Sequence, residues 1–101
     1  MAIITLTSDW GTRDHYTGAV KGTILRLCPT AQIIDITHEI PHFNVQQAAF
    51  ILKNCYQDFP EGTVHILDVT SDQHLPEQPC AVLHKGHYFI GPDNGVFFLL
   101  F

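Results

Sequence analysis

The chain has 101 residues, of which 46% are hydrophobic and 15% are charged, and its formal net charge is −5 with seven neutral histidines. This length and composition predict a single globular domain over residues 1–101 and exclude a disordered chain. The acidic balance, with no basic face, argues against nucleic-acid binding, and the lack of an 18-residue apolar span argues against a membrane segment.

The three cysteines are widely spaced in apolar surroundings and show no metal-type spacing. We expect Cys28, Cys55 and Cys80 to be reduced thiols. Met1 runs directly into an apolar segment without a charged leader or a cleavage site. The sequence therefore predicts a soluble cytoplasmic protein.

The first third of the chain alternates strand and helix signals. An apolar, β-branched run predicts a strand over residues 2–7. A helical pattern follows over roughly 15–28, with Asp14 or Thr12 as its cap. A second apolar run predicts a strand over 32–36.

Two glycines lie inside the first predicted helix, where glycine is costly. Gly18 and Gly22 are four positions apart and so share one face. We expect close packing of the helix backbone against the sheet to explain them.

The middle of the chain repeats the pattern. A loop over 37–43 precedes a helix over about 44–57, in which Asn44 is the N-cap and Gln47 its capping-box partner. An apolar stripe at helical spacing supports this helix. A third strand is expected over about 63–69.

The last third contains shorter elements. Residues 70–79 are polar and contain prolines, which indicates a loop, and residues 80–90 predict a hairpin. A turn over 91–95 leads into a further strand that starts near Val96. The apolar run 96–101 ends without a polar tail, so we expect it to continue in further chain or to be covered by another subunit. The β-α-β-α-β order predicts a three-layer α/β/α domain with a mainly parallel sheet and right-handed crossovers.

Such a topology brings three loops to one edge of the sheet, where the ligands of α/β proteins bind. The loops are 8–14, 37–43 and 70–78. They carry the candidate site residues, which are Asp9, Asp14, His38, Glu39, Phe43, Thr70, Ser71 and Asp72. Most of their polar groups are acceptors, which suits ribose hydroxyls, an ammonium group or a metal ion.

Several of these residues also have purely structural interpretations. Asp9 would cap the turn after the first strand, and Asp14 would serve only as an N-cap. An N-cap carboxylate still has one oxygen for a ligand, so both roles are compatible. Phe43 would be a hydrophobic staple that packs toward Ala48 or Ala49.

His38 would be a core or loop histidine, and Asp72 would form a solvated pair with His74. Residues 38–42 also match the H-E-x-x-H zinc pattern. That pattern needs a helix, and Pro41 inside it disfavours one. We therefore discount a zinc peptidase site.

Phosphate-binding and nucleophile-elbow motifs are missing from the sequence. The turn after the first strand has a single glycine, Gly11, and no G-x-G-x-x-G pattern. No G-x-S-x-G pattern occurs either. A phosphate ligand is disfavoured, more so because acids line the turn.

An ordered series of motifs spans nearly the whole chain and resembles the S-adenosylmethionine hydroxide adenosyltransferases, relatives of the fluorinating and chlorinating adenosyl enzymes. The motifs are Thr7-Ser8-Asp9-Trp10-Gly11, Asp14-His15-Tyr16-Thr17-Gly18-Ala19-Val20-Lys21-Gly22, Ile34-Asp35-Ile36-Thr37-His38-Glu39-Ile40-Pro41, Ala48-Ala49-Phe50, Phe59-Pro60-Glu61-Gly62-Thr63-Val64-His65 and Tyr88-Phe89-Ile90-Gly91-Pro92-Asp93-Asn94-Gly95.

The resemblance implies the N-terminal α/β domain of a longer protein, followed in the family by a β-barrel domain. It also implies a homotrimer with the nucleoside bound between subunits. Family members attack the 5′-carbon of S-adenosylmethionine, a substrate and not a cofactor, with water or halide. By position, Asp9 would hold the ribose diol, Asp14 the methionine ammonium, and Phe43 would form an aromatic wall near the sulfonium.

The sequence departs from the family after the third strand. Water-using members carry Val-Asp-Pro-Gly-Val-Gly and then an Arg, which are thought to position the attacking water. Here the segment 69–74 reads Val-Thr-Ser-Asp-Gln-His, so Thr70 replaces the Asp, and Glu77 lies near the Arg position. We keep Thr70 and Ser71 as substrate-binding candidates, and Asp68 or Asp72 as substitutes for the missing acid.

Three hypotheses follow. The first is hydrolysis of S-adenosylmethionine to adenosine and methionine by in-line displacement, with no metal. The second is a binding module that kept the nucleoside site but lost turnover. The third is a metal-dependent hydrolase that uses Asp9, Asp14 and His38.

Overall fold

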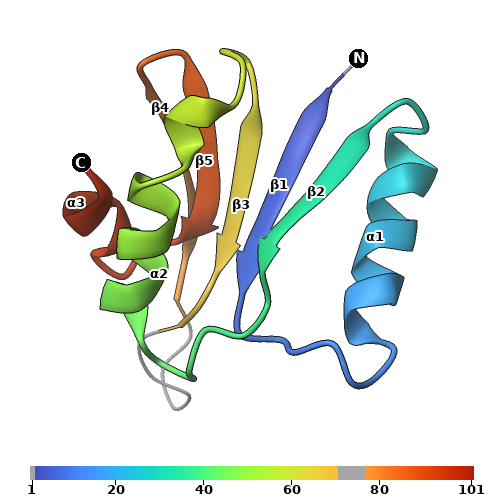
Figure 1. Cartoon of the computed structure of the whole chain (residues 1–101), viewed down its shortest axis with the longest axis horizontal. Coiled ribbons are helices and arrows are strands. Elements are labelled where there is room, and N and C mark those ends of the chain that lie inside the picture. Colours follow the sequence, from blue (N-terminus) through green and yellow to red (C-terminus); the bar gives the residue numbers. More distant parts are fainter. Residues whose placement is uncertain (1, 71–76) are drawn as a thin grey trace.

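The computed structural model describes residues 2–70 and 77–101 and contains a five-stranded sheet in the order β2-β1-β3-β5-β4 (Figure 1). The pairs β1–β2, β1–β3 and β3–β5 are parallel, and β4 is antiparallel to β5. The strands are β1 (Ile3–Ser8), β2 (Gln32–Thr37), β3 (Val64–Asp68), β4 (Pro79–His84) and β5 (His87–Pro92). The predicted mainly parallel α/β fold is confirmed.

Helices lie on both faces of this sheet. They are α1 (Tyr16–Leu27), α2 (Val45–Lys53), the 3₁₀ turn η1 (Tyr56–Asp58) and α3 (Val96–Leu100). Leu67 and Phe89 pack in one cluster with α2 and α3, whereas Ile66 and Ile90, their neighbours along the strands, face a pocket shared with α1. Successive strand residues point to opposite faces, so α1 lies on one side and α2 and α3 on the other. None of the helices within the described ranges is long and apolar enough to cross a membrane.

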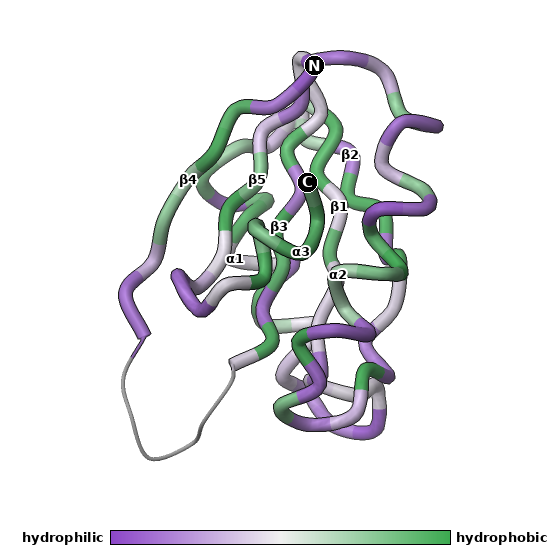
Figure 2. Tube along the Cα trace, turned by 90° about the vertical axis from the view of Figure 1, so that its left-hand side faces the viewer, coloured by the Kyte–Doolittle hydropathy of each residue, from purple (hydrophilic) through white to green (hydrophobic). Residues whose placement is uncertain are grey.

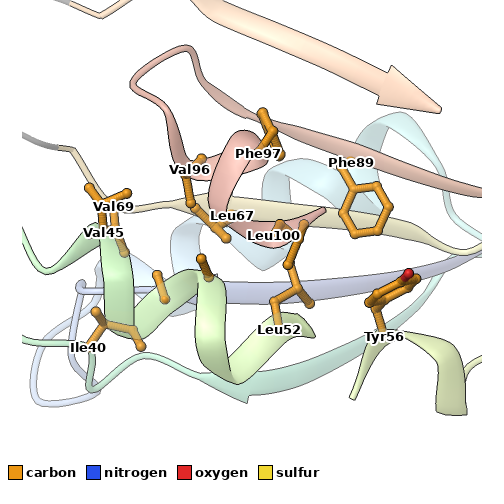
Figure 3. Close-up of a cluster of buried hydrophobic side chains, with 12 residues drawn as sticks. Ile40, Val45, Leu52, Tyr56, Leu67, Val69, Phe89, Val96, Phe97 and Leu100 are labelled. Atoms are coloured by element: carbon orange, nitrogen blue, oxygen red, sulfur yellow. The ribbon is translucent and has the colours of Figure 1, made fainter. Parts of the chain in front are cut away.

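The main core fills the space between the sheet and the α2 side (Figure 3). In Figure 3, side chains from α2, α3, β3 and β5 point toward one another, and Tyr56 closes one end. The tube in Figure 2 shows hydrophobic positions recurring along the strands and α3. The buried cluster consists of Ile40, Val45, Ala48, Ala49, Leu52, Tyr56, Leu67, Val69, Phe89, Val96, Phe97 and Leu100.

Helix α2 begins where its capping residue was predicted. The Asn44 side chain accepts from the backbone N–H of Gln47 at 2.9 Å. The helix ends at Lys53, earlier than expected, and its apolar stripe continues through η1, where Tyr56 is 5% exposed. A change from α to 3₁₀ geometry at a helix end is common and keeps the same face toward the core.

The strand predicted to begin at Val96 is wrong, because this segment forms α3. Gly95 precedes it in the left-handed region at φ +89°, and the Asn94 side chain accepts from the Val96 N–H at 3.2 Å. Val96, Phe97 and Leu100 then face the core at helical spacing. A short, uniformly apolar run fits a strand or a helix equally well, and the turn geometry before it decides here.

The reason expected for Gly18 and Gly22 is also wrong. A Cβ built at either position meets nothing within 4 Å, so neither glycine is required by close packing. Thr17 is the buried residue of α1, and Leu27 is 79% exposed. Helix α1 therefore buries little apolar surface, and polar contacts from Thr17 to the Gly11 carbonyl and from Lys21 to Asp35 help to hold it.

Candidate functional site

The loops that follow β1 and β2 are hydrogen-bonded to each other at the carboxyl edge of the sheet, the lower edge in Figure 1. The N–H of Gly11 donates to the carbonyl of His38 at 2.8 Å, and the N–H of Ile40 donates to the carbonyl of Ser8 at 3.3 Å. This confirms the predicted convergence of the first two loops. Parallel strands end on one side, so Asp68 and Thr70 after β3 lie on the same edge.

Asp9 belongs to the first of these loops and contacts the second. Its carboxylate Oδ2 lies 3.2 Å from His42 Nδ1, and the Asp9 side chain is 16% exposed against 75% for His42. The backbone N–H of Trp10 bonds to the Ser8 hydroxyl at 3.3 Å, so Ser8 stabilises the turn and Asp9 does not cap it. The Asp9 carboxylate therefore contacts an exposed and displaceable partner.

Asp14 does contribute to the start of α1. Its Oδ1 accepts from the N–H of Tyr16 at 3.0 Å, while His15 occupies the N-cap position without a side-chain cap. Thr12, the other candidate cap, bonds instead to Glu39 at 3.5 Å. The second oxygen of the exposed Asp14 carboxylate is available to a cationic group.

Phe43 has an unusual backbone for an aromatic residue. Its φ is +66°, a region that bulky side chains rarely adopt, and its side chain is 42% exposed. Phe43 is not a member of the buried cluster that holds Ala48 and Ala49. It lines a pocket of about 510 Å³ together with His42 and residues of α2 and α3. Strain of this kind is typical of binding sites.

A second, more apolar pocket of about 370 Å³ opens between α1 and the strand ends. Trp10 connects its walls, because its indole Nε1 donates to Asp68 Oδ2 at 2.8 Å and its ring packs edge-on against Tyr16. Thr70 and Glu77 also line this pocket. Ser71, together with the Asp72–His74 pair, lies outside the described residues.

His38 is buried and fully bonded, as its structural interpretation predicted. Its side chain is 2% exposed, with Nδ1 2.5 Å from Ser8 Oγ and Nε2 2.7 Å from Asp35 Oδ1. Residues 38–42 are not helical, so the zinc pattern has no structural basis. Across residues 2–70 and 77–101, no group of three or more His, Cys, Asp or Glu side chains could hold a metal ion.

Three residues of this site were not among the sequence candidates: Trp10, Asp35 and His42. The position of Trp10, directly after Asp9 at the end of the first strand, was a sequence signal that could have marked it as a site residue. Asp35 interrupts an apolar strand, but its side chain is 39% exposed, so its partners His38 and Lys21 could not be inferred from the sequence. His42 was considered only within the zinc pattern.

The candidate site is therefore an acceptor-rich edge with a pocket on either side. Phe43 lines one pocket and Thr70 lines the other. Among the described residues, Asp9 and Asp14 line neither of these two pockets. Two carboxylates and an exposed aromatic ring suit a ligand with hydroxyls and positive charge.

Comparisons with known proteins agree on one family. A family model described as the SAM hydroxide adenosyltransferase N-terminal domain matches residues 4–101. An (R)-S-adenosyl-L-methionine hydrolase of Methanocaldococcus jannaschii is 41% identical over 102 residues, covering 94% of this chain and 38% of that protein. A fluorinase of an Actinoplanes species is 37% identical over 62 residues, covering 61% of this chain and 21% of that protein.

Solved structures show the same fold. A structure described as an uncharacterized conserved protein from Thermotoga maritima has a TM-score of 0.83 at 40% identity, covering 92% of this chain and 36% of that one. A conserved hypothetical protein from Thermus thermophilus has a TM-score of 0.85 at 30% identity, covering 98% of this chain and 41% of that one. The chain thus spans less than half the length of the relatives described here.

Proposed function

Because the chain belongs to the SAM hydroxide adenosyltransferase family, we propose that it binds S-adenosylmethionine and takes part in cleaving it at the ribose 5′-carbon to give adenosine and methionine. The observation that carries this proposal is the Asp9 carboxylate, held at the strand edge against an exposed histidine. Relatives named as hydrolases of this substrate support the reaction.

Each site residue has a defined part in binding. The Asp9 carboxylate accepts hydrogen bonds from both ribose hydroxyls when the ligand displaces His42. The oxygen of Asp14 that is not used at the start of α1 faces the methionine ammonium. The exposed ring of Phe43 stabilises the sulfonium through its π face.

The reaction is an in-line displacement. The oxygen of water forms a bond to the 5′-carbon while the carbon–sulfur bond breaks. The electron pair of the carbon–sulfur bond stays on the sulfur of methionine. Methionine leaves as a neutral thioether and needs no general acid, and the proton that water loses goes to solvent or to a nearby carboxylate. The protein then acts by orienting and desolvating the water, effects that supply several kcal/mol of barrier reduction.

The presence of Thr70 in place of an acid favours the second candidate, a binding module without turnover. Thr70 lines the apolar pocket and stands at the sequence position to which the family resemblance assigns the Asp of the water-using members. Asp68 lies on the same pocket wall, where its Oδ2 accepts the hydrogen bond from Trp10 and holds the carboxylate in one orientation. In this alternative the nucleoside binds and no water is activated.

Oligomeric state and location belong to the same proposal. We place the substrate at the interface of a homotrimer, with the partner subunit covering the exposed edge that bears Asp14 and Phe43. Cys28, Cys55 and Cys80 are free thiols, which is compatible with the cytoplasm.

One experiment separates the two candidates. The protein is incubated with S-adenosylmethionine, product is followed by chromatography, and binding is measured by calorimetry on the same sample. Release of adenosine supports hydrolysis, saturable heat without product supports the binding module, and neither signal contradicts both.

A further inference from the structure

A chain of polar side chains lies directly behind the Asp9 loop and ties β2 to β1. The His38 ring is its centre, with Nδ1 2.5 Å from Ser8 Oγ and Nε2 2.7 Å from Asp35 Oδ1. Asp35 continues the chain to Lys21 on α1. Ser8 is 0% exposed and His38 is 3% exposed, so water does not compete for the bond between them, whereas the Asp35 side chain is 39% exposed.

The charge on Asp35 fixes the direction of the hydrogen bonds that end on its carboxylate. Burial by itself would raise the pKa of Asp35, but hydrogen bonds from Lys21 and His38 outweigh burial and lower that pKa. Asp35 is thus a carboxylate, so its Oδ1 accepts a hydrogen bond from the N–H at His38 Nε2. A neutral ring accepts the Ser8 hydroxyl at Nδ1, whereas a charged ring donates to Ser8 Oγ, so the two side chains stay linked in either form. Ser8 Oγ in turn accepts the N–H of Trp10.

The same histidine also supports the far side of the Asp9 loop. Its ring stacks on the indole of Trp10, with centroids 5.3 Å apart and planes inclined by 13°. Its carbonyl accepts the N–H of Gly11 at 2.8 Å. Asp9 therefore lies between two residues, Ser8 and Trp10, that His38 contacts directly.

We propose that His38 is a positioning residue that sets the orientation of the Asp9 carboxylate for the ribose hydroxyls. This inference rests on the proposed function. Ser8, His38 and Asp35 together resemble a nucleophilic triad, but the buried Ser8 hydroxyl has no access to a substrate. His38 acts through the loop and does not touch the ligand.

The structure offers a matched control for this role on the same strand. Thr5 Oγ1 lies 2.7 Å from His65 Nδ1, another buried hydroxyl–imidazole pair that also starts from β1. Thr5 lies nearer the amino end of the strand, away from Asp9. Ser8→Ala and Thr5→Val each remove one such hydrogen bond, and thermal unfolding shows how much each variant is destabilised.

The test compares binding of adenosine and of S-adenosylmethionine by calorimetry in wild type, Ser8→Ala and Thr5→Val. We expect Ser8→Ala to weaken adenosine binding about tenfold, the equivalent of one misplaced hydrogen-bond pair, while Thr5→Val stays within about twofold of wild type. Equal binding by both variants would overturn the positioning role while leaving the proposed function intact. A wild-type protein that binds neither ligand removes the proposed function, and this inference with it.

Two substitutions of His38 sharpen the result. The amide of His38→Asn occupies the place of Nδ1 and keeps a bond to Ser8, whereas His38→Gln reaches the place of Nε2 and keeps a bond to Asp35. We expect His38→Asn to retain more adenosine affinity than His38→Gln at matched stability. The opposite order contradicts a role that runs through Ser8.

Discussion

The indole Nε1 of Trp10 donates to Oδ2 of Asp68 at 2.8 Å and joins the loop after β1 to the end of β3 across 58 positions of sequence. This contact closes one wall of the pocket between α1 and the sheet. It also fixes one oxygen of Asp68, the acid on the same pocket wall as Thr70, and leaves Oδ1 of that acid outside this bond. The Trp10–Asp68 hydrogen bond therefore stabilises the pocket wall and also sets the orientation of an acid at the carboxyl edge of the sheet.

Asp68→Ala should leave the Trp10 N–H without its partner and lower the free energy of unfolding by about 1–2 kcal/mol. Trp10 is the one tryptophan of the chain, so its fluorescence reports the change without interference. Urea unfolding followed by that fluorescence measures both effects. Asp68→Asn keeps an acceptor and serves as control, and equal loss in both variants would show that charge matters more than the hydrogen bond.

Asp9 and Asp14 should respond differently to two ligands. Asp9→Asn replaces one carboxylate oxygen by a donor and should weaken adenosine and S-adenosylmethionine alike, by about tenfold or more. Asp14→Asn should weaken S-adenosylmethionine but leave adenosine unchanged, since adenosine has no ammonium group. Calorimetry with both ligands gives the comparison, and a loss of adenosine binding in Asp14→Asn contradicts the assignment.

The sheet and two of the helices were predictable because their signals are local. Apolar runs of strand length bounded by turns mark β1, β2 and β3, and Asn44 with Gln47 marks the start of α2. Helix α3 was missed because Val96–Leu100 is apolar at every position, and a uniform run carries no period.

The site could be predicted only as a gathering of loops. Right-handed crossovers bring the ends of β1 and β2 together, so Asp9 and its neighbours were found. The partner of each side chain depends on distances across the sheet that no local pattern encodes. The bonds from Ser8 to His38 and from Trp10 to Asp68 span 30 and 58 positions. The positive φ of Phe43 is set by the conformation of its loop and is not encoded by an aromatic residue itself.

Stability should fall in acid because of a histidine pair at the other end of the sheet. His65 is fully buried, and its Nε2 lies 3.2 Å from His87 Nδ1. Burial, with a smaller contribution from His87, lowers the pKa of His65 from 6.5 to about 4. Between pH 6.5 and about 4 the His65 imidazole is therefore protonated in the unfolded chain but neutral in the folded protein.

The free energy of unfolding should thus be constant near pH 7, decrease as the pH falls from about 6.5 to 4, and change no further from this group below that. The loss amounts to at most about 3 to 4 kcal/mol. Urea unfolding at several pH values measures it, and His65→Phe should flatten the dependence in this window. An unchanged slope in His65→Phe assigns the acid sensitivity to other groups.

Two glycines should respond in opposite ways to alanine. A Cβ on Gly91 would lie 2.4 Å from the carbonyl oxygen of Leu67, a backbone atom of the paired strand that cannot move aside. Gly91→Ala should therefore lower the free energy of unfolding by about 1–3 kcal/mol and distort the pocket that Gly91 lines. Gly22→Ala meets nothing within 4 Å in the exposed interior of α1 and should raise stability by about 1 kcal/mol. Thermal unfolding of both variants decides the matter: a destabilised Gly22→Ala would mean that α1 packs against something closely after all, such as a second subunit.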